Sequence, residues 1–341
     1  MSRHPTWLKG MTREEMAEWL ESLGGEPYRA RQIFHWLYRR LASDTDQMTD
    51  LPAALRAEIA SEASVDALRL LQARESADGS TALAFRLFDD RAVEAVLIPH
   101  ERRTTVCVSS QVGCGFGCSL CATGRLGFSR NLFAAEIVDQ VVQCQRRAGG
   151  RVTNVVFMGM GEPLANYDQV LRAVRLLNDP EGLHIAARHI AISTCGLPPM
   201  IRRLAGENLQ VHLAVSLHAA SDEVRNRLVP INRRYNLRLV VDAARYFMQR
   251  TGRKVTFQYT LIAGVNDTPA QARRLASLLQ GVRAVVNLIP LNAAVEGYQP
   301  PTPEAVTRFR TALATLGLEV AVRHSYGQDV RGACGQLVGA L

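Results

Sequence analysis

The sequence predicts an α/β protein in which a partial (βα)6 barrel follows a small N-terminal helical accessory domain. Two observations predict this fold. From residue 101 on, short apolar runs rich in β-branched residues alternate with amphipathic helical patterns, which is typical of parallel strands buried on both faces. Before residue 67 the apolar spacing is helical only. Six strand–helix units are fewer than the eight of a closed barrel, so we expect an open one.

The chain divides into three ranges. Residues 1–66 form the expected helical domain, whose first helix begins with Thr12 and Glu15 at the spacing of a capping box. Residues 67–100 alternate with a period of two and carry a turn at Asp89-Asp90, which predicts connecting β-strands. Residues 101–341 hold the expected barrel and a C-terminal tail.

Within the barrel region, ligands of parallel sheets bind at the carboxyl ends of strands. The residues that directly follow each strand are therefore the candidates for a functional site. We expect strands at residues 104–110, 154–159, 189–194, 211–218, 255–262, 284–291 and 318–323, and the main helices at 134–145, 167–177, 237–249, 269–280 and 303–316.

The composition indicates a basic protein. The 341 residues are 47% apolar and carry a net charge of +8, and Lys9 and Lys254 are the only lysines among 40 basic residues. Arginine suits bidentate phosphate contacts and base stacking, which favours a polyanionic partner, although codon usage can also enrich arginine. The first residues lack the apolar segment of a signal peptide, and no apolar run reaches membrane-spanning length. We therefore expect a cytoplasmic protein without a membrane partner.

Three cysteines, Cys114, Cys118 and Cys121, follow the first barrel strand in a glycine-rich loop with the spacing Cys-x3-Cys-x2-Cys. Thiolates suit iron–sulfur clusters, zinc and copper. Iron–sulfur clusters usually have four cysteine ligands, so three would leave one iron of a cubane cluster open to a cofactor or substrate. Structural zinc usually takes four ligands, and no second cysteine pair accompanies these three. The spacing favours the cluster, and it is similar to the signature of radical S-adenosylmethionine (SAM) enzymes.

Other strand ends carry glycine or polar residues. The motif Gly-Met-Gly-Glu-Pro at 159–163 follows the second strand, where glycine lets the backbone approach a ligand closely. By itself it could be an ordinary turn in which Asn166 caps the next helix. Polar residues at several strand ends on one edge make a binding site the better interpretation. The candidates are Gly161, Glu162, Ser193, Ser216, Leu217, His218 and Asn292.

The remaining cysteines do not form a disulfide framework, because the total of seven is odd and three lie in one loop. We expect Cys144 and Cys195 to be buried packing residues. Cys107 lies on the first barrel strand. Cys334, between glycines in the polar tail, is less easily explained by packing and is a candidate reactive thiol.

Several motifs together resemble the radical SAM adenine-C2 methyltransferases of 23S rRNA and tRNA, the RlmN/Cfr type. These are SQVGCGFGCSLCATG, FMGMGEPLAN, AVSLHA, LVPIN, AGVND, NLIP and ACGQL, with YRARQIFHWLYRR and MTDLP near the start. The resemblance covers nearly the whole chain in the same order. It implies a radical SAM barrel with one [4Fe-4S] cluster on the three loop cysteines, and SAM, used twice per turnover, bound by the seven strand-end residues above. It also implies 23S rRNA and tRNA as partners, RNA docking by residues 1–66, an electron donor such as flavodoxin, and a monomer.

The resemblance further implies the catalytic residues Glu94, Cys107 and Cys334. Cys334 would be methylated by one SAM, and a second would yield a 5′-deoxyadenosyl radical that takes a hydrogen from this methyl group. The resulting carbon radical would add to the adenine ring. Cys107 would resolve the protein–RNA adduct by forming a transient disulfide with Cys334, and Glu94 would be a proton acceptor.

The tail departs from the family pattern at Arg331-Gly332, where relatives of this type carry an acidic pair, and its SYGQD stretch is closer to the branch that methylates adenine C8. Three alternatives therefore stand beside C2 methylation. They are C8 methylation of the Cfr type, another radical SAM enzyme with a small-molecule substrate, and an RNA-binding module with a structural metal.

Overall fold

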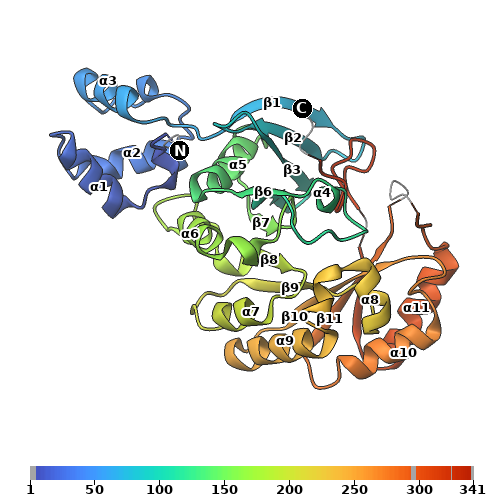
Figure 1. Cartoon of the computed structure of the whole chain (residues 1–341). Helices are drawn as coiled ribbons and strands as arrows, with labels where there is room; N and C mark the ends of the chain where they lie inside the picture. Colours follow the sequence, from blue (N-terminus) through green and yellow to red (C-terminus); the bar gives the residue numbers. More distant parts are fainter. Residues whose placement is uncertain (1–4, 293–296, 324, 339–341) are drawn as a thin grey trace.

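The computed structural model describes residues 5–292, 297–323 and 325–338 (Figure 1). Its N-terminal domain contains η1 (Leu8–Gly10), α1 (Arg13–Ser22), α2 (Arg29–Tyr38), η2 (Thr45–Gln47) and α3 (Ala53–Glu62). The predicted capping box is present, because Glu15 N–H donates to Thr12 Oγ1 over 3.2 Å and Thr12 N–H donates to Glu15 Oε2 over 2.8 Å. These bonds satisfy backbone donors that the first helical turn leaves unpaired.

A ten-stranded sheet with the order β1-β2-β3-β4-β7-β8-β9-β10-β11-β12 forms the centre of the described structure. Each of its first four strands is antiparallel to its neighbour, whereas from β4 onward neighbouring strands are parallel. The strands of residues 67–100 therefore continue the sheet of the barrel. The bounds are β1 (Arg69–Glu75), β2 (Thr81–Arg86), β3 (Ala92–His100), β4 (Arg103–Cys107), β7 (Asn154–Phe157), β8 (Ile190–Thr194), β9 (His212–Ser216), β10 (Val255–Leu261), β11 (Ala284–Pro290) and β12 (Glu319–Val322).

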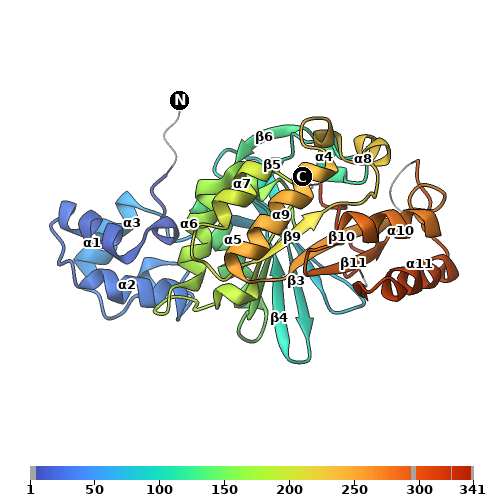
Figure 2. The same ribbon diagram turned by 90° about the horizontal axis from the view of Figure 1, so that it is seen from below.

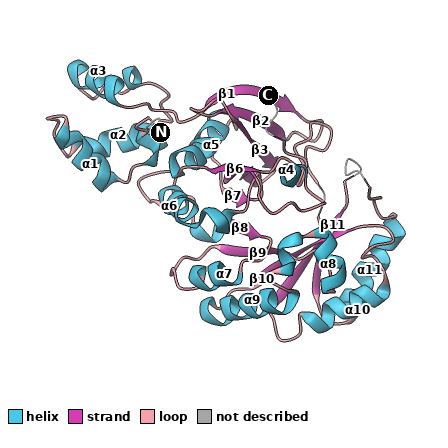
Figure 3. Cartoon of the chain, viewed as in Figure 1, coloured by secondary structure: helices cyan, strands magenta, loops and turns pink. Residues whose placement is uncertain are grey.

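Helices follow the parallel strands and cover the outer face of the curved sheet (Figures 2 and 3). They are α5 (Ala134–Arg147), α6 (Tyr167–Asn178), α7 (Pro198–Leu204), α8 (Asp222–Leu228), α9 (Leu237–Thr251), α10 (Pro269–Leu278) and α11 (Pro303–Thr315), with the short turns η3 (Pro163–Asn166), η4 (Ala187–His189) and η5 (Pro230–Arg233). The short helix α4 (Ala122–Arg125) belongs instead to the cysteine loop. The open α/β barrel expected from the sequence is confirmed. None of the described helices has the length and apolar character needed to cross a membrane.

The main core lies between the sheet and its helices. Strand residues such as Val155, Phe257 and Val286 are fully buried, and so are Val141 and Phe247 on the covering helices. Apolar, β-branched strands buried on both faces are what the sequence pattern predicted. The polar strand ends are thus left at the edge of this core, where the site forms.

A buried ion network joins the N-terminal domain to the barrel. Lys9, which has no solvent exposure, binds Asp66 and the fully buried Asp139 of α5. Asp139 Oδ2 also accepts the backbone N–H groups of Ala67 and Leu68, each over 2.9 Å. Because an unpaired charge is costly in the interior, this network fixes the helical domain against α5.

Candidate active site

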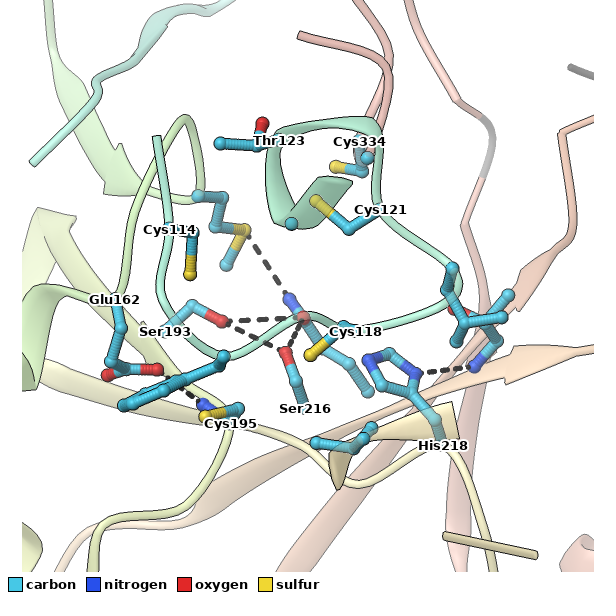
Figure 4. Close-up of a pocket in the computed structure, with 18 of the residues that line it drawn as sticks. Cys114, Cys118, Cys121, Thr123, Glu162, Ser193, Cys195, Ser216, His218 and Cys334 are labelled. Carbon is cyan, nitrogen blue, oxygen red and sulfur yellow. Dashed lines mark hydrogen bonds between the residues drawn. The ribbon is translucent and has the colours of Figure 1, made fainter. Parts of the chain in front are cut away.

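The three loop cysteines, Cys114, Cys118 and Cys121, line one cavity at the carboxyl end of the parallel strands (Figure 4). The two ends of the loop pair as a small antiparallel ribbon of β5 (Gln111–Gly113) and β6 (Phe128–Asn131). Gly113 has a φ of +71°, and a Cβ there would lie 1.9 Å from the carbonyl oxygen of Gly127. Only glycine allows the two backbones to approach this closely.

The thiol chemistry of this loop fits a cluster. Burial raises the pKa of Cys114 to about 11 and that of Cys118 to about 12, so iron binding would displace a proton from each thiol. Among the described residues, no three His, Cys, Asp or Glu side chains converge on a single-ion site. A cubane cluster does not require such convergence, because each thiolate binds a different iron.

Glu162 joins the loop after β7 to the end of β8. Its Oε1 accepts the Leu164 N–H over 3.0 Å, and its Oε2 accepts the Cys195 N–H over 2.8 Å. Its own N–H donates to Gln111 Oε1 over 2.8 Å. Gly161 permits this contact, since a Cβ there would lie 2.5 Å from Gln111 Cβ. The carboxylate therefore braces the rim of the cavity as well as lining it.

Gln258, which the sequence analysis missed, connects two predicted residues. Its Oε1 accepts the Ser216 hydroxyl over 3.1 Å and lies 3.4 Å from Ser193 Oγ, while its Nε2 contacts Met158 Sδ at 3.4 Å. All four residues line the cavity. The available signal was a polar side chain in the middle of the apolar strand VTFQYTLI.

His218 presents a neutral ring to the cavity. Burial, with a smaller contribution from the charge of Arg225, lowers its pKa to about 3. Its Nδ1 accepts the Thr260 N–H over 3.0 Å, so the neutral ring carries its proton on Nε2 (Figure 4). This nitrogen can donate a hydrogen bond to a ligand. The residue has a φ of +57°, a conformation that costs energy for a non-glycine residue.

Arg225 on α8 is the second residue that sequence reasoning missed. It is fully buried and donates to the carbonyl oxygens of Leu217 over 3.0 Å, Ser216 over 3.3 Å and Cys195. It also donates to Asn232 Oδ1 over 2.8 Å. One guanidinium thereby fixes the ends of β8 and β9. Leu217 does not line the cavity, and its backbone is held from behind by Arg225.

Asn166 occupies the N-cap position of α6, as the interpretation of the turn by itself predicted, but its side chain does not cap the helix. Its Nδ2 donates to the carbonyl oxygens of Ser110 and Leu132, each over 2.8 Å. An amide has two donor hydrogens, and here two carbonyls flanking the cysteine loop use them. Asn166 thus ties the loop to the second strand unit.

The tail brings Cys334 to the same cavity. Cys334 is exposed, lines the cavity beside the three loop cysteines, and its carbonyl lies 3.4 Å from Asn292 Nδ2. Cys107 is buried and lines a smaller adjoining cavity together with Cys334. Burial first, and then the proximity of Cys334, raises the pKa of Cys107 to about 12.

Glu94, the expected proton acceptor, lines neither of these cavities. It is fully buried on β3, with Oε1 at 2.5 Å from Arg74 Nη2 and Oε2 accepting the Val338 N–H over 2.9 Å. In this structure it therefore anchors the segment that follows Cys334. Its role in proton transfer stays a prediction.

Comparison with known proteins decides the family. The model of the radical SAM superfamily matches residues 108–276, and that of the ribosomal RNA large subunit methyltransferase N-terminal domain matches residues 6–65. A probable dual-specificity RNA methyltransferase RlmN of Symbiobacterium thermophilum is 48% identical, with 99% of this chain and 92% of the relative covered. The chain belongs to the RlmN family of radical SAM RNA methyltransferases.

Two further comparisons agree over the full length. The dual-specificity RNA methyltransferase RlmN of Syntrophobacter fumaroxidans is 45% identical, with 98% of each chain covered. A crystal structure of a radical SAM methyltransferase from Sphaerobacter thermophilus matches with a TM-score of 0.97 and 48% identity, covering 98% of this chain and 100% of that one. The resemblance expected from the motifs is confirmed.

Membership of the RlmN family implies a [4Fe-4S] cluster and SAM. The residues present fit both groups: three thiols line the cavity without converging on one ion, and glycine, serine, histidine and asparagine donors or acceptors line the rest. Cys195 is buried in an apolar cluster, as the predicted packing role requires, and it also lines this cavity. It lies at the end of β8, where its backbone is held by Glu162 and Arg225.

Proposed function

We propose that this enzyme methylates C2 of an adenosine in 23S rRNA and in tRNA, through a methyl group carried on Cys334. The observation that carries the proposal is the position of Cys334, an exposed thiol lining the cavity of the three loop cysteines. C2 is an electron-poor amidine carbon, so a polar methyl transfer to it is unfavourable. The cluster and SAM supply one-electron chemistry, and two SAM molecules are used in each turnover.

Cys334 and Cys107 act in different steps of the proposed reaction. Covalent attachment to the RNA through Cys334 splits one difficult step into easier ones. Cys107 would then attack the sulfur of Cys334, so that a disulfide forms as the RNA carbon leaves. The two cysteines line the same small cavity, which supports this pairing. In the described structure both are free thiols, as the resting state of such a cycle requires.

Glu94 is proposed as the proton acceptor. Its carboxylate group is paired with Arg74 at 2.5 Å and lies next to the tail, which supports a role for it close to Cys334. Because Oε2 holds the Val338 N–H, the carboxylate reaches substrate only after a movement of the tail. SAM would be held by Gly161, Glu162, Ser193, Ser216, His218 and Asn292, while Leu217, whose N–H and carbonyl are bound by Gln258 and Arg225, would hold the strand end between Ser216 and His218.

The N-terminal domain is proposed to dock the RNA. Arginines pair with aromatic rings at both ends of α2: Arg29 lies 5.0 Å over the exposed Tyr28 ring, and Arg40 lies 5.9 Å over Trp36. Such pairs suit phosphate contacts and stacking on splayed-out bases. The target base must be unstacked to reach the cavity. We also propose that the enzyme is cytoplasmic and monomeric and that it receives electrons from a donor such as flavodoxin.

The test is mass spectrometry of nucleosides from unmodified 23S rRNA and tRNA after incubation with cluster-loaded enzyme, SAM and a reductant. We expect 2-methyladenosine from wild type, and none from Cys334→Ala at unchanged iron content. An 8-methyladenosine product would assign the enzyme to C8 chemistry. Cleavage of SAM without any methyladenosine would refute the proposed RNA substrate.

A further inference from the structure

The turn between β1 and β2, residues 76–80, contacts the tail that carries Cys334. Ser76 Oγ donates to Asp329 Oδ1 over 2.5 Å, and the Ala77 N–H donates to Asp329 Oδ2 over 3.0 Å. In the reverse direction, the Gly327 N–H donates to Asp78 Oδ2 over 2.7 Å. Two carboxylates, one from each segment, thus bind the other segment reciprocally.

The turn itself is pre-organised for this contact. Asp78 Oδ1 accepts the N–H of Ser80 over 2.9 Å and its hydroxyl over 2.5 Å, and Gly79 supplies the left-handed residue of the turn with a φ of +82°. Burial opposes the ionisation of Asp78, yet hydrogen bonds from Ser80 and from the Gly327 N–H hold its pKa at about 2. Its carboxylate is therefore ionised at neutral pH.

The far side of the tail is held by the cysteine loop and by β3. The Ala122 N–H donates to the Gly335 carbonyl over 2.7 Å, and Thr123 Oγ1 donates to the Leu337 carbonyl over 2.7 Å. Beyond these, Glu94 accepts the Val338 N–H. Cys334 thus lies between two attachments, one on the turn at 76–80 and one on the segment that carries the cluster ligands.

We propose that residues 76–80 and Asp329 form a clamp that positions Cys334 over the cysteine loop and beside Cys107. The proposal rests on the proposed function in taking Cys334 as the methyl carrier. It assigns to β1 and β2 the role of a docking platform for the tail, beyond their role as connecting strands. Asp329 is a positioning residue, because it reaches the site only through the tail.

Closure of a disulfide between Cys334 and Cys107 reports this position without RNA or SAM. The exposed Cys334 thiolate attacks oxidised glutathione, forms a mixed disulfide and releases one glutathione thiolate. The Cys107 thiolate then displaces the second glutathione and forms the internal disulfide, and the two cysteine protons pass to the two glutathione thiolates. The second step is intramolecular, so its rate depends on the effective concentration of one sulfur at the other.

The experiment compares wild type with Asp329→Ala, which removes the two contacts of Asp329 and leaves the turn and the Gly327–Asp78 contact in place. Intact mass and peptide mapping follow the mixed and the internal disulfide over time. We expect the mixed disulfide to form at an unchanged rate, and closure to slow by about tenfold, because a less constrained tail lowers the effective concentration of one sulfur at the other. Gln328→Ala is the matched control, since the side chain of this exposed neighbour donates to the Ser325 carbonyl of its own segment and not to the turn at 76–80.

Ser76→Ala removes one of the three contacts that the turn makes with the tail and should slow closure by an intermediate factor. It also keeps the test decisive if Asp329→Ala does not fold. Unchanged or faster closure in both variants would overturn the clamp. Because the reaction needs no RNA, a failure of the proposed methylation would leave this result unaffected, and the two proposals can fail separately.

Discussion

Glu162 accepts a hydrogen bond from the backbone N–H of Cys195 over 2.8 Å and thereby connects the ends of two neighbouring parallel strands. On the other side of the same residue, the Cys195 carbonyl accepts from Arg225. A buried carboxylate and a buried guanidinium thus hold one peptide of the cavity wall. Each side chain is held by more than one hydrogen bond, which restricts its rotation.

Glu162→Gln should weaken the wall of the cavity. The amide keeps one acceptor oxygen but turns an NH2 group toward one of two N–H donors, which leaves a buried donor unpaired at about 1–3 kcal/mol. We expect this loss in the free energy of unfolding, together with weaker SAM binding by calorimetry. Glu207→Gln is the control, since Glu207 also accepts two hydrogen bonds but lies outside the cavity. Equal SAM affinity in wild type and Glu162→Gln would contradict the role given to this residue.

Arg225→Lys should destabilise the protein although the charge is kept. A lysine cannot reach the several carbonyls that the planar guanidinium bridges, and buried carbonyls left unpaired cost about 1–3 kcal/mol each. We expect a loss of more than about 3 kcal/mol in urea unfolding. Arg227→Lys on the exposed side of the same helix should change stability by less than about 0.5 kcal/mol. Similar losses in both variants would mean that the bridging geometry is unimportant.

Comparing Gly161→Ala with Gly149→Ala separates two costs of adding a Cβ, namely the contact with Gln111 and the positive φ of the backbone. Both glycines have a positive φ, +98° at Gly161 and +61° at Gly149. They differ in the space around them: a Cβ at Gly161 would lie 2.8 Å from the backbone nitrogen of Gln111, whereas a Cβ at Gly149 would have no heavy atom within 4 Å. We expect Gly149→Ala to cost about 1–2 kcal/mol from φ alone, and Gly161→Ala to cost more and to reduce iron incorporation. If both variants lose the same stability, the packing against Gln111 is not limiting.

His218 should make stability depend on pH. Its pKa is about 3 in the folded protein against an ordinary value of 6.5, so the unfolded chain binds the extra proton between these values. Stability should therefore be complete above pH 6.5 and fall as the pH is lowered toward 3, by up to about 1.4 kcal/mol per pH unit for this group. His218→Gln should reduce the change of unfolding free energy with pH in this range. His35→Gln, at an exposed position on α2, should leave that change as it is in wild type. An unchanged slope in His218→Gln would place the acid sensitivity elsewhere.

Two cysteines of the same cavity should differ in their effect on the cluster. Cys118→Ala removes one of the three loop thiols, and we expect loss of iron and of the visible absorption of the reconstituted enzyme. Cys195→Ala, at the end of β8, should keep both, because its backbone is the part held by Glu162 and Arg225. Loss of iron from Cys195→Ala would make Cys195 a ligand and would revise the assignment of the open iron.

Much of the fold follows from local periodicity. The parallel strands and their helices lie where alternating apolar runs predicted them, and Thr12 caps its helix as its spacing indicated. Turn chemistry also located the hairpin at Asp89-Asp90 between β2 and β3. These features depend on neighbours within a few residues, which a sequence pattern records directly.

The supporting residues of the site could not be predicted in the same way. Arg225 looks like one of many surface arginines, and only the fold buries it behind β8 and β9. Asn166 was expected to cap a helix because the local pattern allowed it, but its amide instead bonds two carbonyls that are distant in sequence. The contact between Ser76 and Asp329 depends on the complete topology and has no local signature.

The docked tail also has a consequence for how the enzyme is made. Ser76 and Asp329 are 253 residues apart, so at ordinary translation speeds the platform leaves the ribosome about 13–50 s before the tail segment that binds it. During that interval the strands from β2 to β12 are synthesised in order, while Cys334 does not yet exist. The cysteine loop is therefore made well before the reactive thiol, so its three sulfurs can take their places before a fourth exposed sulfur is present to compete with them.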